Sequence, residues 1–198
     1  MNYELLKKNF EGHRFHTSYF PTKEEAAEYL KGKIHGELVG FGGSMTVKEM
    51  GLDECLSKDN EIVWHWLTPG QEARLKARDA SVYILSANGV SETGEIVNID
   101  GTGNRLAASL FGPKRAFYVV GRNKIEPDLP AAMKRARNVA AAKNALRLQT
   151  KTPCAADGGK QCYECTSPER ICCATVILER PCQGMEVEII FIDEDLGF

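Results

Sequence analysis

Apolar residues in this chain gather in short runs, and segments with helical spacing separate most of these runs. Short runs rich in Val, Ile, Phe and Tyr are typical of strands that are buried in a sheet. The sequence predicts strands at residues 37–41, 61–67, 82–85, 96–99, 115–121, 174–178 and 186–192.

Helices are predicted between these strands by apolar spacing and by capping signals. The tetrapeptides at 22–25 and 46–49 both read Thr-x-x-Glu, which is the capping box of a helix start. Predicted helices begin at residues 3 and 46 and cover residues 22–33, 71–79, 105–111 and 129–148. This alternation predicts an α/β fold with a mostly parallel sheet covered by helices on both faces. We divide the chain into an N-terminal helical segment, 1–36, and an α/β domain, 37–198, which includes a cysteine-rich loop at 152–182.

Residues 86–104, SANGVSETGEIVNIDGTGN, surround the predicted strand 96–99 with small and polar residues. Glycines at positions 89, 94, 101 and 103 let the backbone turn or approach another group closely. Acidic and amide side chains beside such turns suit the ligand site of an open α/β sheet, which lies at the strand ends. The alternative is two tight turns that carry polar residues, and composition favours neither interpretation.

A second candidate site is Gly42-Gly43-Ser44, which joins the strand 37–41 to the next predicted helix. Free backbone N–H groups at a helix start suit a phosphate or a carboxylate. The spacing matches neither the dinucleotide fingerprint nor the Walker A loop, so a simple tight turn is the alternative. Lys124 follows the strand 115–121 and is placed to face an anionic ligand.

Net charge and the lengths of the apolar runs exclude some classes of protein. The 198 residues include 25 Lys and Arg against 27 Asp and Glu, a net charge of −2, which argues against a general nucleic-acid binder. No apolar run approaches the roughly 20 residues of a membrane span. The first ten residues lack the apolar core of a signal peptide, so we expect a cytoplasmic protein.

Six of the seven cysteines lie between residues 154 and 182. Their spacing from Cys154 to Cys172 is C-x7-C-x2-C-x6-C, and a C-x2-C pair is a usual half-site for zinc or for an iron–sulfur cluster. We predict that Cys154, Cys162, Cys165 and Cys172 bind the metal, with Cys173 or Cys182 in reserve. A metal-free redox dithiol, a disulfide and free cysteines stay open as alternatives. Cys55 is interpreted as a core cysteine.

The histidines and one basic helix face are interpreted as structural. His13 and His16 lie three residues apart with no third ligand nearby, and solvated side chains explain them. His65 lies between two tryptophans and is interpreted as a packed side chain. The basic residues of the helix 129–148, Arg147 among them, are assigned to a solvated face.

Several segments together resemble the LUD-domain (lactate utilisation) family. They are VGFGGSMTVKEMGL, SANGVSETGEIVNIDGTGNRLA, FGPKRAFYVVGRNKI, RARNVAAAKNALRL, TPC…CYEC…RICC and DEDLGF, in this order from about residue 37 to residue 198. The resemblance implies an α/β fold related to the ribose-5-phosphate isomerase, glucosamine-6-phosphate deaminase and CoA-transferase group. It also implies a role in the oxidation of L-lactate to pyruvate, beside iron–sulfur partner subunits.

The same resemblance implies roles for particular residues. The loop after the first strand binds phosphate or CoA in that fold group, and Gly42-Gly43-Ser44 takes its place here. CoA transferases carry a nucleophilic Glu in a Ser-Glu-Asn-Gly motif, which Ser91-Glu92-Thr93-Gly94 resembles with Thr in place of Asn. The cysteine segment is absent from some family members. The chain also lacks the two ferredoxin-type cysteine runs of a self-sufficient electron carrier.

Three functions follow as hypotheses. The first is an accessory redox protein of lactate utilisation that holds an iron–sulfur cluster or zinc. The second is an isomerase or CoA-transferase type of enzyme, and the third is a zinc-stapled module that binds a small anionic ligand; homo-oligomerisation stays open for all three. Candidate catalytic residues are Glu92 and Asp100, and candidate ligand-binding residues are Gly42, Gly43, Ser44, Asn98, Asn104, Arg105 and Lys124.

Overall fold

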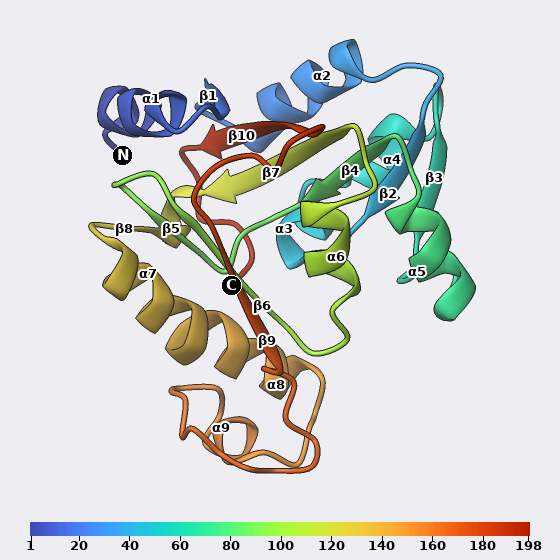
Figure 1. Ribbon diagram of the computed structural model, residues 1–198. Coiled ribbons are helices and arrows are strands. Elements are labelled where there is room, and N and C mark those ends of the chain that lie inside the picture. Colours follow the sequence, from blue (N-terminus) through green and yellow to red (C-terminus); the bar gives the residue numbers. More distant parts are fainter.

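A six-stranded parallel sheet forms the centre of the computed structural model, which describes residues 1–198 (Figure 1). The strand order is β1-β10-β7-β4-β2-β3, and every neighbouring pair is parallel. The inner strands are buried on both faces, which explains their continuous apolar runs. The six strands are β1 (His16–Phe20), β2 (Leu38–Phe41), β3 (Glu61–Trp64), β4 (Val82–Leu85), β7 (Arg115–Gly121) and β10 (Glu186–Ile192).

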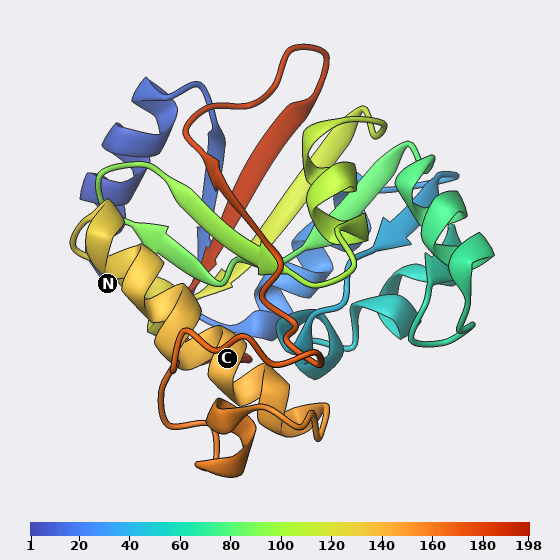
Figure 2. The same cartoon turned by 60° about the horizontal axis from the view of Figure 1, so that its bottom comes forward.

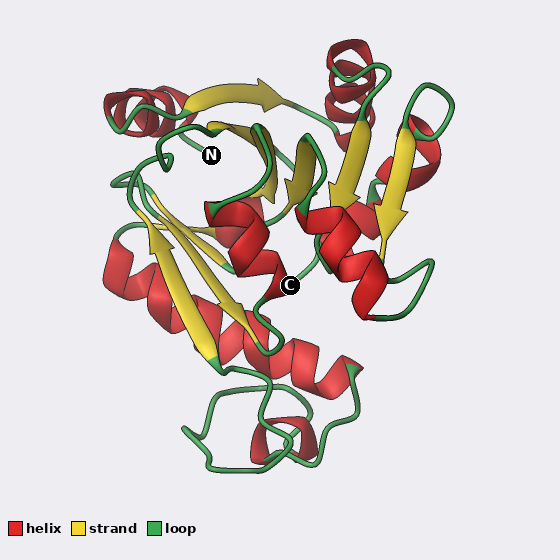
Figure 3. Ribbon diagram, turned by 45° about the vertical axis from the view of Figure 1, so that its right-hand side comes forward, coloured by secondary structure: helices red, strands yellow, loops and turns green.

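Helices cover both faces of this sheet, which confirms the predicted α/β class (Figure 3). Side chains alternate along β4, so that Val82 and Ile84 pack on one face while Tyr83 and Leu85 pack on the other. The face of Val82 is covered by α2 (Lys23–Lys33), α3 (Met45–Glu49) and α4 (Leu52–Leu56). The face of Tyr83 is covered by α1 (Tyr3–Gly12), α5 (Gln71–Arg78) and α6 (Asn104–Leu110).

A smaller second sheet, in the order β8-β5-β6-β9, also packs on the face of Tyr83. It consists of β5 (Gly89–Ser91), β6 (Ile96–Asp100), β8 (Ile125–Glu126) and β9 (Ala174–Leu178). β6 pairs antiparallel with β5 and β9, while β5 and β8 are parallel. The sequence predicted β6 and β9 as strands but predicted neither β5 and β8 nor a separate sheet, because β5 and β8 are too short to show a pattern.

The long helix predicted at 129–148 is present, but its middle is π-helical. It runs through α7 (Leu129–Arg135), the π-helical segment η2 (Ala136–Ala141) and α8 (Ala142–Arg147). Val97 and Ile99 of the second sheet pack against this helix. Figure 2 shows the long helix running alongside that sheet. Single π-helical turns inside α-helices often lie at functional sites.

The N-terminal segment 1–36 contains a strand as well as the two predicted helices. β1 is an edge strand of the main sheet and pairs with β10. Its sequence, His-Thr-Ser-Tyr-Phe, is mostly polar and only partly buried, so it carries no strand pattern of its own. The hydrogen bonds to β10 therefore stabilise β1 as a strand, because its own sequence does not favour one.

No helix of this chain is both long and apolar enough to cross a bilayer. The cytoplasmic location stays a prediction. So does the likeness to the ribose-5-phosphate isomerase and CoA-transferase fold.

Gly40 lets β2 approach α5 closely, and a side chain there is expected to destabilise the fold. A Cβ atom at Gly40 would overlap the backbone carbonyl of Ala77, which cannot move without the whole helix. We expect Gly40→Ala to lower the free energy of unfolding by about 2 kcal/mol or more, as overpacked cores do. The matched control is Gly32→Ala, because a Cβ atom at Gly32 in α2 meets nothing within 4 Å. Urea unfolding measures both; equal stability of Gly40→Ala and the native chain would contradict the expectation.

Candidate functional site

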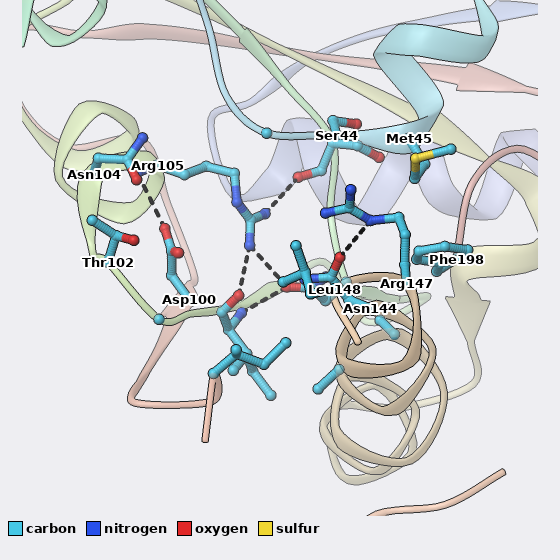
Figure 4. Close-up of a pocket in the computed structure, with 18 of the residues that line it drawn as sticks. Ser44, Met45, Asp100, Thr102, Asn104, Arg105, Asn144, Arg147, Leu148 and Phe198 are labelled. Atoms are coloured by element: carbon cyan, nitrogen blue, oxygen red, sulfur yellow. Dashed lines mark hydrogen bonds between the residues drawn. The ribbon is translucent and has the colours of Figure 1, made fainter. Parts of the chain in front are cut away.

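A cavity of about 400 Å³ lies at the carboxyl ends of the central parallel strands (Figure 4). Its walls come from the segments that follow β2, β3, β4 and β7, from the end of β6, and from the η2 and α8 part of the long helix. Ligands of open α/β sheets bind at this end of the strands. The volume lies within the range of small-molecule sites.

The cavity is lined by most of the predicted site residues, both ligand-binding and catalytic. Gly43, Ser44, Asp100, Asn104, Arg105 and Lys124 all line it. Gly42 and Asn98 lie directly behind the lining and support it. The Gly42 carbonyl accepts a hydrogen bond from Trp64 Nε1 at 3.1 Å, and the Asn98 Oδ1 accepts one from Arg105 Nη1 at 2.6 Å. The Gly43 and Ser44 N–H groups donate to no acceptor within the chain.

Glu92 is not part of this cavity. It follows β5, where its N–H donates to the Glu126 carbonyl at 2.8 Å and its carbonyl accepts from Asn9 Nδ2 at 2.6 Å. Asn88 lines the cavity, but the strand that starts at Gly89 carries the chain away from it by about 3.3 Å per residue. The sequence pattern predicts one site over residues 86–104 and does not reveal this separation.

The lining is strongly cationic. Four basic side chains face one carboxylate side chain, that of Asp100; the four are Arg74, Arg105, Lys124 and Arg147. Lys124 is only 4% exposed, and its Nζ donates to the Ala87 carbonyl at 3.2 Å. Burial, with the nearby charges of Arg135 and Arg105, lowers the pKa of Lys124 to about 7. Its charge therefore responds to pH and to an anion in the cavity.

Arg105 is buried, and its side chain links neighbouring segments by hydrogen bonds (Figure 4). Its Nη1 donates to the Ser86 carbonyl and to Asn98 Oδ1, and its Nη2 donates to Asn88 Oδ1 and to the Ile99 carbonyl. A guanidinium has five N–H donors, so Nε–H is the one left. Arg105 thus joins the end of β4 to the end of β6 and adds positive charge to the cavity.

Three buried side-chain atoms of the chain have no hydrogen-bond partner: His65 Nδ1, Arg74 Nε and Ser86 Oγ. All three residues line this one cavity. Buried polar atoms in folded proteins nearly always have partners, because leaving one unpaired costs about 1–3 kcal/mol. Burial and the charge of Arg74 also lower the pKa of His65, so its imidazole is neutral near pH 7. The unpaired atoms themselves are closed to solvent, so the wall of this cavity is polar and not fully hydrogen-bonded.

Arg147 and His65 were assigned structural roles from the sequence, and both line the cavity. The Arg147 guanidinium lies 4.9 Å from the ring centre of Trp66, and its Nε donates to Asn144 Oδ1 at 2.9 Å. Trp66 stacks in turn on Trp64, with ring centres 5.0 Å apart. Helical periodicity places Arg147 on a face but does not show what that face meets, so no sequence signal could have found it.

The four predicted metal ligands, Cys154, Cys162, Cys165 and Cys172, line a second cavity of about 20 Å³. All seven cysteines are free thiols, and no three His, Cys, Asp or Glu side chains are arranged as a ready metal site. Cys173 is exposed, and Cys55 packs against the core as predicted.

Comparison with known proteins identifies the family. The model of the LUD domain matches residues 3–192. A crystal structure of a DUF162 family protein from Deinococcus radiodurans has a similar fold, with a TM-score of 0.55, 10% sequence identity, and coverage of 96% of this chain and 95% of that one. Among curated proteins, none matches this sequence significantly. Since the LUD-domain match spans nearly the whole chain, this protein belongs to the LUD domain family, which is associated with lactate utilisation.

Proposed function

We propose that this protein is an accessory component of L-lactate oxidation to pyruvate, and that its main cavity binds a small anionic ligand. The observation that carries the binding proposal is the cationic lining, in which four basic side chains stand against the single carboxylate side chain of Asp100. Family membership supports the lactate context. Iron–sulfur partner subunits would carry the electrons, and the role of this chain is to bind and position the anion.

Charge and volume define the ligand class. The four basic side chains and one carboxylate give the cavity a net charge of +3 when Lys124 is protonated. A liquid water occupies about 30 Å³, so a cavity of 400 Å³ holds a ligand much larger than a three-carbon acid. A phosphorylated compound with two or more negative charges fits both properties better than lactate alone.

Each part of the lining has a physical role in this proposal. Arg147 is stacked on Trp66, which holds its planar guanidinium for paired hydrogen bonds to a phosphate or a carboxylate. Lys124 supplies a buried charge whose attraction to an anion is little screened. Asp100, whose Oδ2 accepts from the Arg105 N–H at 3.1 Å, keeps acceptor capacity for a ligand hydroxyl.

An isomerase or CoA-transferase activity that uses Glu92 as its nucleophile is less well supported. A covalent nucleophile must reach the bound substrate, and Glu92 lies outside the cavity. Asp100 is the one carboxylate side chain of the lining, so proton transfer in this cavity would use Asp100.

Binding is tested by calorimetric titration with inorganic phosphate, coenzyme A, pyruvate and L-lactate. We expect the phosphorylated ligands to bind more tightly than lactate, and Arg147→Gln to weaken the tightest of them about tenfold or more through loss of a charge-assisted hydrogen bond. Lys143→Gln is the matched control, because Lys143 is exposed on the same helix and does not line the cavity. Equal affinities of Arg147→Gln and the native chain, or no binding of any of the four compounds, would overturn the proposal.

A further inference from the structure

The cysteine-rich loop is closed at its base and is hydrogen-bonded to the long helix. The Lys151 N–H donates to Glu169 Oε2 at 2.7 Å, and Ser167 Oγ donates to the Lys151 carbonyl at 2.8 Å, which closes the loop at its base. The Cys162 N–H donates to Asn138 Oδ1 of η2 at 3.0 Å. These bonds bring four cysteines that span 19 positions of sequence to one small cavity.

Hydrogen bonds to sulfur already surround this cavity. The Glu164 N–H lies 3.4 Å from Cys162 Sγ, within the C-x2-C turn, and Glu164 has the left-handed φ of 47° that this tight turn requires. Arg170 Nε donates to Cys172 Sγ at 3.1 Å, and Arg170 Nη1 donates to the Cys165 carbonyl at 2.8 Å. Supporting hydrogen bonds of this kind orient the first ligands of a metal site.

The volume of the cavity favours a single ion over a cluster. One water-sized sphere needs about 10–15 Å³, so the cavity of about 20 Å³ has room for one ion as the loop stands, whereas four iron and four sulfide atoms would need it to open much further. Four thiolates around one divalent ion carry a net charge of −2. Arg170 and Arg137, which both line the cavity, supply the balancing charge of +2.

We propose that Cys154, Cys162, Cys165 and Cys172 bind a single soft divalent ion of the zinc type, with Arg170 as a supporting hydrogen-bond donor. The sulfurs are not yet grouped as a ready ligand set, so binding draws them to the bond length of about 2.3 Å that zinc–thiolate sites have. Gly158 lies between the first two ligands, and a Cβ atom built on it would meet nothing within 4 Å, so no side-chain packing holds the loop in place there. The proposal stands independently of the anion-binding function.

The metal site would share a wall with the anion cavity. Ile171, which precedes Cys172, lines both cavities, and so does Ala141 of η2. The Cys173 N–H donates to the Asp100 carbonyl at 3.0 Å, so the loop is hydrogen-bonded to the strand end that presents the Asp100 carboxylate. A metal at this position fixes one wall of the anion cavity.

The test is an anaerobic titration of the reduced, metal-free full chain with Co²⁺, followed by displacement with Zn²⁺. We expect one ion per chain and an intense sulfur-to-cobalt charge-transfer band. Cys165→Ser should lose at least about 100-fold in affinity and Arg170→Gln about tenfold, since loss of a supporting partner alone costs 10–100-fold. Cys173→Ser is the matched control and should bind like the native chain, because Cys173 does not line the cavity.

A second measurement uses the native chain and does not depend on folding of the variants. Zn²⁺ should protect Cys154, Cys162, Cys165 and Cys172 from alkylation, read by mass spectrometry, while Cys173 stays reactive. Absence of the charge-transfer band or equal protection of Cys173 would overturn the proposal. So would the binding of more than one iron with inorganic sulfide per chain when iron and sulfide are supplied in place of Co²⁺. None of these readouts involves the anionic ligand, so failure here is distinct from failure of anion binding.

Discussion

The Lys124→Met variant is expected to be more stable than the native chain at pH 6 and to bind its anion about 10- to 150-fold more weakly. The loss of affinity follows from the loss of a charged hydrogen-bond donor in a buried place, which is worth about 1.5–3 kcal/mol. The gain in stability follows from the burial of Lys124, which is only 4% exposed. A substitution that weakens ligand binding but raises the free energy of unfolding indicates that Lys124 serves binding at the expense of stability.

The pH dependence gives this prediction a sharp readout. The pKa of Lys124 falls from its ordinary value of 10.5 to about 7 on folding, so between these values the unfolded chain binds more protons than the folded one. The stability contribution of Lys124 therefore rises with pH over that range and is most unfavourable below pH 7. From pH 6 to pH 9 the stability advantage of Lys124→Met should shrink by roughly 2 to 3 kcal/mol, following the linkage relation.

Urea unfolding at pH 6 and pH 9, without ligand, measures this difference. The control is Lys134→Met, because Lys134 is exposed on α7 and its substitution should leave the pH profile unchanged. A Lys124→Met variant whose stability runs parallel to that of the native chain at both pH values would show that Lys124 is not the buried titrating group described.

Arg105→Met is expected to lower the free energy of unfolding by about 3 to 5 kcal/mol. The guanidinium satisfies four acceptors, and the substitution leaves them without a donor in a place where Arg105 itself is only 9% exposed. Each unpaired buried acceptor costs about 1–3 kcal/mol before relaxation. Arg105→Lys should lose nearly as much, because a single ammonium cannot reproduce the planar fork that joins the ends of β4 and β6.

Urea unfolding again gives the measurement, with Arg78→Met as the control. Arg78 is a half-exposed residue of α5 whose ion pair with Asp79 lies at the surface, and such pairs contribute about 0–1 kcal/mol. If Arg105→Lys kept full stability, the charge rather than the geometry of Arg105 would be what matters. Anion affinity should fall as well, through distortion of the lining.

The main sheet could be predicted from the sequence because burial on both faces leaves a continuous apolar run. β4 and β7 have this pattern, and both lie near the middle of the sheet. β1 could not be predicted, because an edge strand with polar residues looks like a loop until β10 pairs with it. Hydrogen bonds to a distant partner are not encoded in local spacing.

The candidate site was predictable where it depends on strand direction. Gly43, Ser44 and Lys124 follow different parallel strands, and the carboxyl ends of such strands meet at one edge. Glu92 lies outside the cavity because β5 carries the chain away from it and only the antiparallel strand β6 brings the chain back. Arg147 was missed because its surroundings depend on how the long helix docks, which helical periodicity does not determine.

The position of β10 in the sheet has a consequence for folding during synthesis on the ribosome. β10 is the last strand in the sequence, yet it lies between β1, the first, and β7. While a ribosome is still making the segment before Glu186, β1 has no neighbour in the sheet and one side of β7 is open. An uncovered strand edge is a template for pairing with other chains. Nascent molecules of this protein are therefore open to mispairing until residue 192 has left the exit tunnel.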